Sequence, residues 1–380
     1  MKKLSDYRKL FPICEEGIYL NHAGVAPTSL PVCEAVQAWM LELARRGIHM
    51  GATWEEDAAK VRDSAARLVG AEAHEITFVR NTSHGLGLVA EGIDWQQGDE
   101  VICCPEVEYQ SNVYVWQHLS HYGVRVVEVE PEGGGVSLEA VEKARTDKTK
   151  LLAVSAVQFA TGHKTELKAL GQFCKAHDIL FCVDGIQWIG SAPLDVKEFG
   201  IDFLAADSHK WMLGVCGIGL LFVDETKLSR LRPVLVGWKS TTAPFDFDTV
   251  RFDIREDASK FEEGSSAYPL IAGFGACLDL LHEVGLDVIE ARLGQLQERL
   301  EKGCVDLGAE VSPPAGSRGG SIFVKWPGEI TGSIYEALEQ SGVRASLRRG
   351  RIRFSPHFYT LDEEIDEVLR RMSELVKQFS

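Results

Sequence analysis

The 380-residue sequence lacks the features of several protein classes. No stretch of 18 or more apolar residues occurs, and residues 1–7 have no apolar segment typical of a signal peptide. Basic residues are also scarce: 40 Lys and Arg stand against 56 Asp and Glu, for a net charge of −16. A protein that binds the phosphate backbone of nucleic acids needs a basic face. We therefore expect a cytoplasmic protein with neither a nucleic-acid partner nor a membrane association.

The cysteine, histidine and glycine patterns disfavour further classes. The nine cysteines include no C-x-x-C pair, and several lie in apolar segments, which is typical of reduced, buried thiols. No H-E-x-x-H motif occurs, and His118, His121 and His49 do not form a recognisable metal-binding set. Gly85 and Gly87 lack the rest of a dinucleotide-binding fingerprint. The sequence therefore predicts no metal site and no nicotinamide cofactor.

What the sequence does contain is a repeated alternation of apolar strands and amphipathic helices between residues 76 and 223. Continuous apolar strands are typical of a mostly parallel sheet covered by helices on both faces, so we predict an α/β fold. A loop-rich stretch begins near residue 236, and two long helices and a small α+β unit follow. We predict an N-terminal arm (1–22), a large domain (23–265) and a smaller α+β C-terminal domain (266–380).

Lys210 follows an apolar strand predicted over 203–206. A lysine at a strand end is commonly a solvated charge, but a desolvated amine beside positive groups can attack an aldehyde. A second apolar strand, 179–183, leads directly into Asp184. A lysine for the aldehyde and an aspartate for the protonated pyridine nitrogen are the two anchors of pyridoxal 5'-phosphate. The pair therefore indicates a site for this cofactor.

Other candidates follow neighbouring strands. Thr82 and Ser83 open a predicted helix, whose free N–H groups favour a phosphate, although an ordinary N-cap has the same composition. Gln187 is placed to reach the phenolic oxygen of the cofactor ring, or is a polar loop residue. Tyr109 is placed to stack on a flat ring, or is a packing residue.

With these residues in place, the chain resembles the class V aminotransferase family of pyridoxal-phosphate enzymes. That family includes cysteine desulfurases, selenocysteine lyases, kynureninase-like enzymes and isopenicillin-N epimerase-like proteins. The resemblance extends from Tyr19 to the C-terminus, and it implies a PLP-transferase-like large domain. The matching motifs are Tyr19-Leu20-Asn21-His22-Ala23, Arg46-Gly47-Ile48-His49, Asn81-Thr82-Ser83, Val183-Asp184-Gly185-Ile186-Gln187, Asp207-Ser208-His209-Lys210-Trp211, Phe261-Glu262-Glu263-Gly264-Ser265 and Arg353-Phe354-Ser355.

The resemblance implies a role for each cofactor-binding residue. Lys210 would form the Schiff base with the cofactor and then carry the proton, while Asp184 would bind the pyridine nitrogen and Gln187 the ring oxygen. Tyr109 occupies the position of a ring-stacking histidine in the desulfurases. The phosphate would be held by Thr82, Ser83, Ser208 and His209.

The resemblance also implies a substrate site and a partner. Arg353 would grip the α-carboxylate of the substrate, as a bidentate guanidinium does well, and Asn21 and His49 would line the entrance. Ser265 matches a threonine that reaches the phosphate of the neighbouring subunit, which implies a homodimer with shared active sites.

One departure from the family concerns sulfur chemistry. Desulfurases carry a nucleophilic cysteine shortly before the carboxylate-binding arginine, whereas 342–350 here contains none. We therefore expect an enzyme that acts on an α-amino acid as an aminotransferase or a β-eliminating lyase. An amino-acid epimerase is an alternative, and a cysteine desulfurase is a less favoured one. A non-catalytic protein that binds the cofactor is the competing class.

Overall fold

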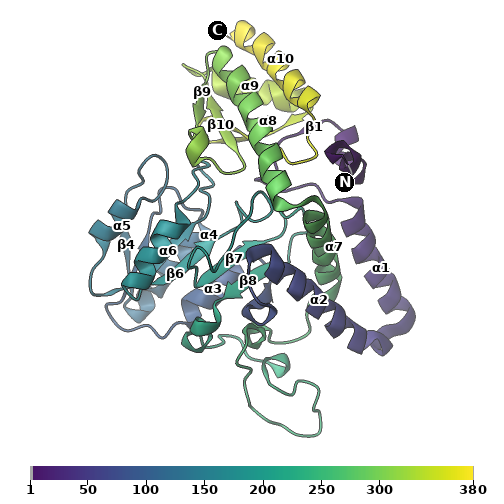
Figure 1. Ribbon diagram of the computed structural model, residues 1–380, viewed down its shortest axis with the longest axis vertical. Coiled ribbons are helices and arrows are strands. Elements are labelled where there is room, and N and C mark those ends of the chain that lie inside the picture. Colours follow the sequence, from purple (N-terminus) through teal and green to yellow (C-terminus); the bar gives the residue numbers. More distant parts are fainter. Residues whose placement is uncertain (1–2, 380) are drawn as a thin grey trace.

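A seven-stranded sheet forms the centre of the larger part of the computed structural model, which describes residues 3–379 (Figure 1). The strand order is β2-β8-β7-β6-β5-β3-β4. All neighbours are parallel except the two pairs that β8 makes, so the predicted mostly parallel sheet is confirmed. The strands are β2 (Ile76–Val79), β3 (Glu100–Cys103), β4 (Arg125–Glu128), β5 (Thr149–Ser155), β6 (Leu180–Asp184), β7 (Phe203–Asp207) and β8 (Gly219–Val223).

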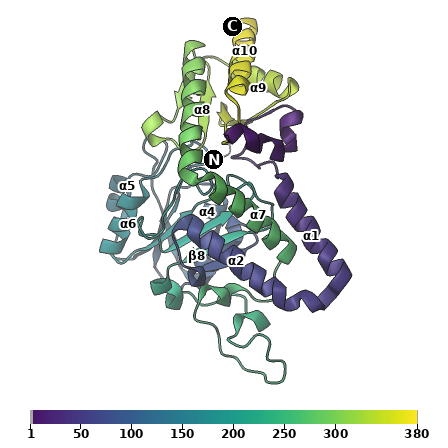
Figure 2. The same cartoon turned by 45° about the vertical axis from the view of Figure 1, so that its right-hand side comes forward.

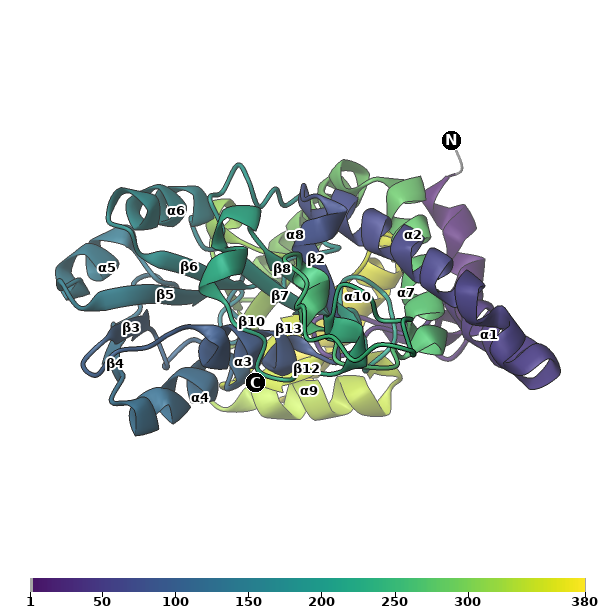
Figure 3. The same ribbon diagram turned by 90° about the horizontal axis from the view of Figure 1, so that it is seen from below.

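Helices cover both faces of this sheet, as the continuous apolar strands predict (Figure 3). Successive side chains of a strand point to opposite faces. Leu151 and Ala153 of β5 thus pack in the core under α3 (Thr82–Gly92) and α4 (Ser111–His118). Leu152 and Val154 lie in the other core, which includes residues of α2, α6 and α7. The helices on that side are α1 (Leu30–Arg46), α2 (Gly51–Val69), α5 (Leu138–Ala144), α6 (Leu167–Ala176) and α7 (Tyr268–Val284).

Two glycines of α7 allow α1 and α2 to pack closely against it (Figure 2). A Cβ atom on Gly273 would lie 2.8 Å from the side chain of Val36 in α1, and one on Gly275 would lie 2.7 Å from Val61 in α2. Both distances are shorter than side chains tolerate, so larger residues would push the three helices apart.

The smaller part of the molecule has its own core under a four-stranded antiparallel sheet of order β12-β13-β10-β9. The N-terminal arm joins it, because β1 (Ile18–Tyr19) pairs with β11 (Val343–Arg344). The remaining elements are β9 (Glu310–Ser312), β10 (Ile322–Lys325), β12 (Ser346–Arg348), β13 (Arg351–Phe354), α8 (Leu286–Asp306), α9 (Ile330–Gln340) and α10 (Asp362–Phe379).

Short 3-10 segments connect these elements. They are η1 (Leu4–Leu10), η2 (Pro12–Glu15), η3 (Gly47–Met50), η4 (Ala73–Glu75), η5 (Leu119–Tyr122), η6 (Glu225–Arg230), η7 (Trp238–Ser240), η8 (Ala258–Phe261) and η9 (Ala315–Ser317).

The predicted domain division stays a prediction, and the packing shows which elements share a core. Helix α7 contributes Phe274 and Leu278 to the core of the large sheet. Helix α8 spans both parts, since Ile289 packs in that core and Leu300 packs in the core of the smaller part. Within residues 3–379 no single helix has the length and apolar character to cross a membrane; α7 and α8 meet those criteria only as a pair bent by 76°.

Candidate active site

A cavity of about 400 Å³ lies at the edge of the large sheet where β6 and β7 end. That volume is in the range of sites for small ligands and cofactors. The N-terminal ends of α3 and α4 and the β12–β13 hairpin of the smaller part complete its walls. The structure brings together there most of the residues that the sequence singles out: Thr82, Ser83, Tyr109, Asp184, Gln187, His209, Lys210 and Arg353.

Lys210 follows β7, and its side chain lines the cavity without a paired acid in the described part of the chain. Its Nζ atom lies 5.7 Å from the centre of the Tyr109 ring. Burial, together with the positive charges of Arg353 and Arg348, lowers the pKa of Lys210 to about 8, against the opposing effect of Asp184. An amine with such a pKa is neutral in a substantial fraction of molecules near neutral pH, as a Schiff-base lysine requires.

Asp184, the last residue of β6, is a buried carboxylate that lacks a full set of partners. Its Oδ1 atom accepts the N–H of Ile186 at 3.0 Å, the only hydrogen bond to this side chain within residues 3–379. Burial raises the pKa of Asp184 to about 7, and the nearby acid Glu108 adds to that effect. A ligand with a protonated ring nitrogen would supply the missing donor, so the residues present fit a pyridine ring.

The first turn of α3 offers anion-binding groups to the other end of the cavity. Asn81 caps this helix, and its Oδ1 atom accepts the N–H of His84 at 2.8 Å. The backbone N–H groups of Thr82 and Ser83 belong to the first turn, which leaves them without intrahelical acceptors. The Ser83 hydroxyl lies 2.6 Å from that of Ser111, which opens α4 and also lines the cavity. The set fits a phosphate.

Of the other predicted cofactor-binding residues, Gln187 and His209 line the cavity and Ser208 does not. Gln187 is fixed there, since its amide nitrogen donates to the carbonyl of Ala23 and its oxygen accepts the indole N–H of Trp211, each at 3.1 Å. The ring of His209 lies 2.9 Å from a carboxylate oxygen of Asp207. Ser208 is not among the cavity-lining residues, because its hydroxyl donates to the carbonyl of Val215 at 2.8 Å.

Arg353 is a buried guanidinium without a carboxylate partner in residues 3–379. It is 2% exposed, and it donates to the hydroxyl of Ser346 at 3.1 Å and to the side-chain oxygen of Asn21 at 3.4 Å. Burial lowers the pKa of Arg353 to about 9, and Arg348 contributes to that shift. A buried charge left without an ion partner is costly, so this position suits an anion that enters with the substrate. Asn21 thus reaches the site through Arg353.

Two predicted residues lie elsewhere. His49 is exposed on η3 and does not line the cavity. Ser265 borders a separate cavity of about 190 Å³, together with Arg80 and His84. Because the resemblance assigns Ser265 to the phosphate of a neighbouring subunit, its place beside a separate cavity of its own chain does not test that role, which stays a prediction.

The sequence analysis missed Arg348 and Glu108. Arg348 lines the cavity. It alternates on β12 with Ser346, which lies opposite Arg353 of β13, so both side chains point to the same face as Arg353, and this alternation is the pattern that would have revealed it. Glu108 is buried and accepts hydrogen bonds from the N–H of Ser155 at 2.7 Å, from Gln158 at 2.8 Å and from Asn112 at 2.9 Å. These bonds fix the loop that carries the adjacent residue Tyr109. Two of the three partners, Ser155 and Gln158, lie 47 and 50 residues away along the chain, so no local sequence pattern indicates the bonds.

The cavity combines three features at the ends of adjacent strands in a helix-covered parallel sheet. They are a lysine whose amine can be neutral, a buried acid and a helix terminus that can bind an anion. Together they define a pyridoxal-phosphate-dependent enzyme. The chain belongs to the class V aminotransferase family: the family model for Aminotransferase class-V matches residues 18–368. The cofactor of this enzyme is pyridoxal 5'-phosphate, and the lysine and buried acid that the cavity offers, Lys210 and Asp184, fit that group.

Relatives and solved structures agree with this assignment. A probable cysteine desulfurase of Pyrococcus abyssi (strain GE5 / Orsay) is 29% identical, over 99% of this chain and 98% of its own. The apo structure of a cysteine desulfurase from Thermococcus onnurineus NA1 superposes with a TM-score of 0.90 at 28% identity, covering 100% and 99% of the two chains. The cystine C–S lyase C-DES, in complex with its product cysteine persulfide, gives 0.89 at 25% identity, covering 96% and 99%. A mutant of C-DES carries glycine covalently linked to its PLP cofactor; it gives 0.90 at 25% identity, covering 97% and 99%.

Proposed function

We propose that this protein is a β-eliminating C–S lyase that cleaves a sulfur-substituted α-amino acid carrying a second acidic group, such as cystine. The observation that carries the proposal is the content of the cavity: one lysine, two guanidinium groups that pair with no acid of residues 3–379, and no cysteine among the lining residues. The likeness to the cystine C–S lyase C-DES supports the same chemistry.

The roles of the side chains follow from their placement. Bound pyridoxal 5'-phosphate supplies an electron-accepting ring that stabilises the negative charge left after proton removal. Asp184 keeps the ring nitrogen protonated, and Arg353 holds the substrate's α-carboxylate. Lys210, with its pKa lowered to about 8, takes the proton from Cα and returns it as needed. The Cβ–S bond then breaks and its electron pair leaves with sulfur. Overall, cystine and water give cysteine persulfide, pyruvate and ammonia.

Elimination needs no nucleophile from the protein, whereas a desulfurase needs a thiol to accept sulfur. Residues 342–350 form part of a short hairpin without cysteine. Cys33 and Cys216 are exposed, and neither they nor the other cysteines line the cavity. The desulfurases among the relatives nevertheless make desulfuration the second candidate.

Product analysis with an amino-acid panel tests the proposal. We expect pyruvate, ammonia and cysteine persulfide in equal amounts from cystine. Alanine with sulfur bound to the protein would instead identify a desulfurase, and a keto acid with stoichiometric pyridoxamine phosphate would identify an aminotransferase. The mirror-image amino acid would identify an epimerase. Failure of every substrate to exchange its α-proton with heavy water would identify a non-catalytic binding protein.

The second acidic group of the substrate is tested through Arg348. We expect Arg348→Ala to lower kcat/KM for cystine about tenfold, because one charge-assisted hydrogen bond is lost. The loss for an S-alkyl cysteine, which has one carboxylate, should stay below about twofold. Arg349→Ala is the matched control, since Arg349 donates to the backbone carbonyl of Glu106 and lies outside the cavity lining. Equal losses for both substrates would refute the role of Arg348 in recognising a second acid.

We also propose that the enzyme is a homodimer. Residues 241–254 form the loop that projects at the bottom of Figure 1. This loop carries several exposed large apolar side chains, which a partner surface would cover. They are Phe245 (57% exposed), Phe247 (83%), Val250 (104%) and Phe252 (74%). Light scattering should give twice the chain mass of 42.0 kDa, and Phe247→Ser should shift the protein toward the monomer. A wild-type protein that stays at the chain mass would contradict the dimer.

A further inference from the structure

Glu91, His118 and His121 form a compact group at the distal ends of α3 and α4. Their ligating atoms all lie within 4.8 Å of one another, and they are the one group of three or more such side chains that residues 3–379 contain. Glu91 lies nine residues after Thr82, which at about 1.5 Å per helical residue places it roughly 14 Å from the cofactor end of α3. The mechanism proposed above uses none of the three.

The hydrogen bonds of His121 and Glu91 leave each side chain with one atom that can bind a metal ion. The Nδ1 atom of His121 lies 2.6 Å from the carbonyl of His118, an acceptor, so Nδ1 carries the proton and the lone pair is on Nε2. The hydroxyl of Tyr122 donates to Oε2 of Glu91 at 3.1 Å. That bond leaves Oε1 free, and Oε1 lies 3.8 Å from Nε2 of His118.

We propose that Glu91, His118 and His121 bind a divalent transition-metal ion of the Zn²⁺ type, which joins the ends of α3 and α4. Two imidazoles and a carboxylate are a common protein ligand set for Zn²⁺. Bonds of about 2.0–2.1 Å in tetrahedral geometry place ligand atoms roughly 3.4 Å apart, so the side chains need only small movements. Both histidines are exposed, which permits those movements. Water would complete the coordination.

The position of this site gives it a structural consequence. The same two helices begin at the cavity, where the Ser83 and Ser111 hydroxyls are 2.6 Å apart. A metal at their far ends would fix their separation and stabilise this layer of the fold. The sequence predicted no metal site because only the spacing of possible ligands along the chain is visible there. Glu91 lies on a different helix from the two histidines, and only the tertiary structure brings it close to them.

Calorimetric titration of the chelator-treated holoenzyme with ZnCl₂ tests this site. We expect one equivalent of Zn²⁺ per chain in the wild type, and His118→Ala/His121→Ala should weaken that binding by about a hundredfold or more. Glu91→Gln keeps the shape and removes the charge, so we expect about tenfold weaker binding. The matched control is His74→Ala, because His74 is also exposed and pairs with a single acid, Glu225, at 3.1 Å. That variant should bind Zn²⁺ like the wild type.

Thermal unfolding provides a second readout that is independent of activity. ZnCl₂ should raise Tm in the wild type and in His74→Ala, but not in the double variant. Retention of the same stoichiometry and affinity in the double variant would overturn the proposal and place the ion elsewhere, for example on exposed thiols. A wild type that shows no binding with ZnCl₂ in molar excess would overturn it as well.

Discussion

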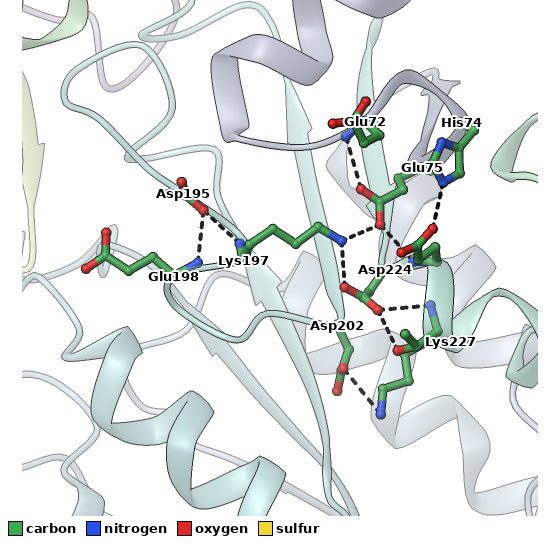
Figure 4. Close-up of polar contacts among 11 residues, drawn as sticks. Glu72, His74, Glu75, Asp195, Lys197, Glu198, Asp202, Asp224 and Lys227 are labelled. Carbon is green, nitrogen blue, oxygen red and sulfur yellow. Dashed lines mark hydrogen bonds and ion pairs between the residues drawn. The ribbon is translucent and has the colours of Figure 1, made fainter.

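The two edges of the seven-stranded sheet, where its strands begin and end, differ in how their charged side chains are paired. Where β2 and β7 begin and β8 ends, acids and lysines are paired, whereas at the cavity edge a lysine, an arginine and an acid have no ion partner among residues 3–379. Figure 4 shows the paired edge: Lys197 reaches between Glu75 and Asp224, and Lys227 lies 3.6 Å from Asp202.

The paired edge satisfies its charges fully. Glu75 is buried, and besides Lys197 it accepts the backbone N–H groups of Glu72 at 3.0 Å and Glu225 at 2.8 Å. Burial acts to lower the pKa of Lys197, but the hydrogen bonds to Asp224 and Glu75 outweigh it, and the pKa is raised. This lysine is therefore a fixed cation that ties loops together.

The cavity edge shifts the pKa of its lysine in the other direction. Burial lowers the pKa of Lys210 to about 8 and raises that of Asp184 to about 7. Groups whose pKa values approach neutrality can exchange protons, and they cluster at functional sites. The two lysines thus differ both in partners and in exposure: Lys197 is exposed and lies between two acids, whereas Lys210 lines the cavity and has no ion partner within residues 3–379. We therefore expect Lys210 to act in catalysis and Lys197 to stabilise the fold.

The largest expected effect separates these two lysines by activity. Lys210→Ala should reduce exchange of the substrate α-proton with heavy water, followed by NMR, by about a thousandfold or more, because the proton acceptor is removed. Lys197→Ala should keep exchange within about threefold of the wild type, since Lys197 lies at the opposite edge. Wild-type exchange in Lys210→Ala would mean that another group takes the proton.

The next effect separates the two edges by stability. Glu75→Ala should lower the free energy of unfolding by about 3 kcal/mol, because it leaves two backbone N–H groups and Lys197 without their acceptor. Urea unfolding followed by circular dichroism measures this loss. Lys168→Ala is the control: its pair with Glu198 at 2.9 Å is exposed on both sides, so we expect a change below about 1 kcal/mol. Equal losses in both variants would contradict the distinction.

The smallest effect concerns pH. Uptake of pyridoxal 5'-phosphate by the cofactor-free protein needs the neutral amine of Lys210, whose fraction rises as the pH passes its pKa of about 8. The uptake rate, followed by absorbance, should therefore rise about tenfold between pH 7 and pH 9 and then level off. Arg353→Gln removes a nearby positive charge, so the pKa of Lys210 should increase and the midpoint should move to higher pH. A rate that is flat over this range would contradict the lowered pKa.

Much of the fold was predictable because its signals are local. The alternation of apolar strands with helices is visible along the chain, and parallel strands end at one edge of a sheet, which brought Asp184 and Lys210 together. Helix α9 and strands β9 and β12 were missed. Gly332 and Ser333 weaken the helical propensity of α9, and the two strands are too short, at three residues each, to show alternation.

The sequence by itself determined which chemical groups stand at the strand ends, since strand periodicity and motif order are properties of the chain. Only the tertiary structure decided the protonation behaviour of those groups. The pKa of Lys210 depends on burial and on Arg348 and Arg353, which arrive from the smaller part of the molecule more than a hundred residues later. Electrostatic energy depends on distance and on exclusion of water. Both are set by how the chain folds and cannot be read from the order of residues along it.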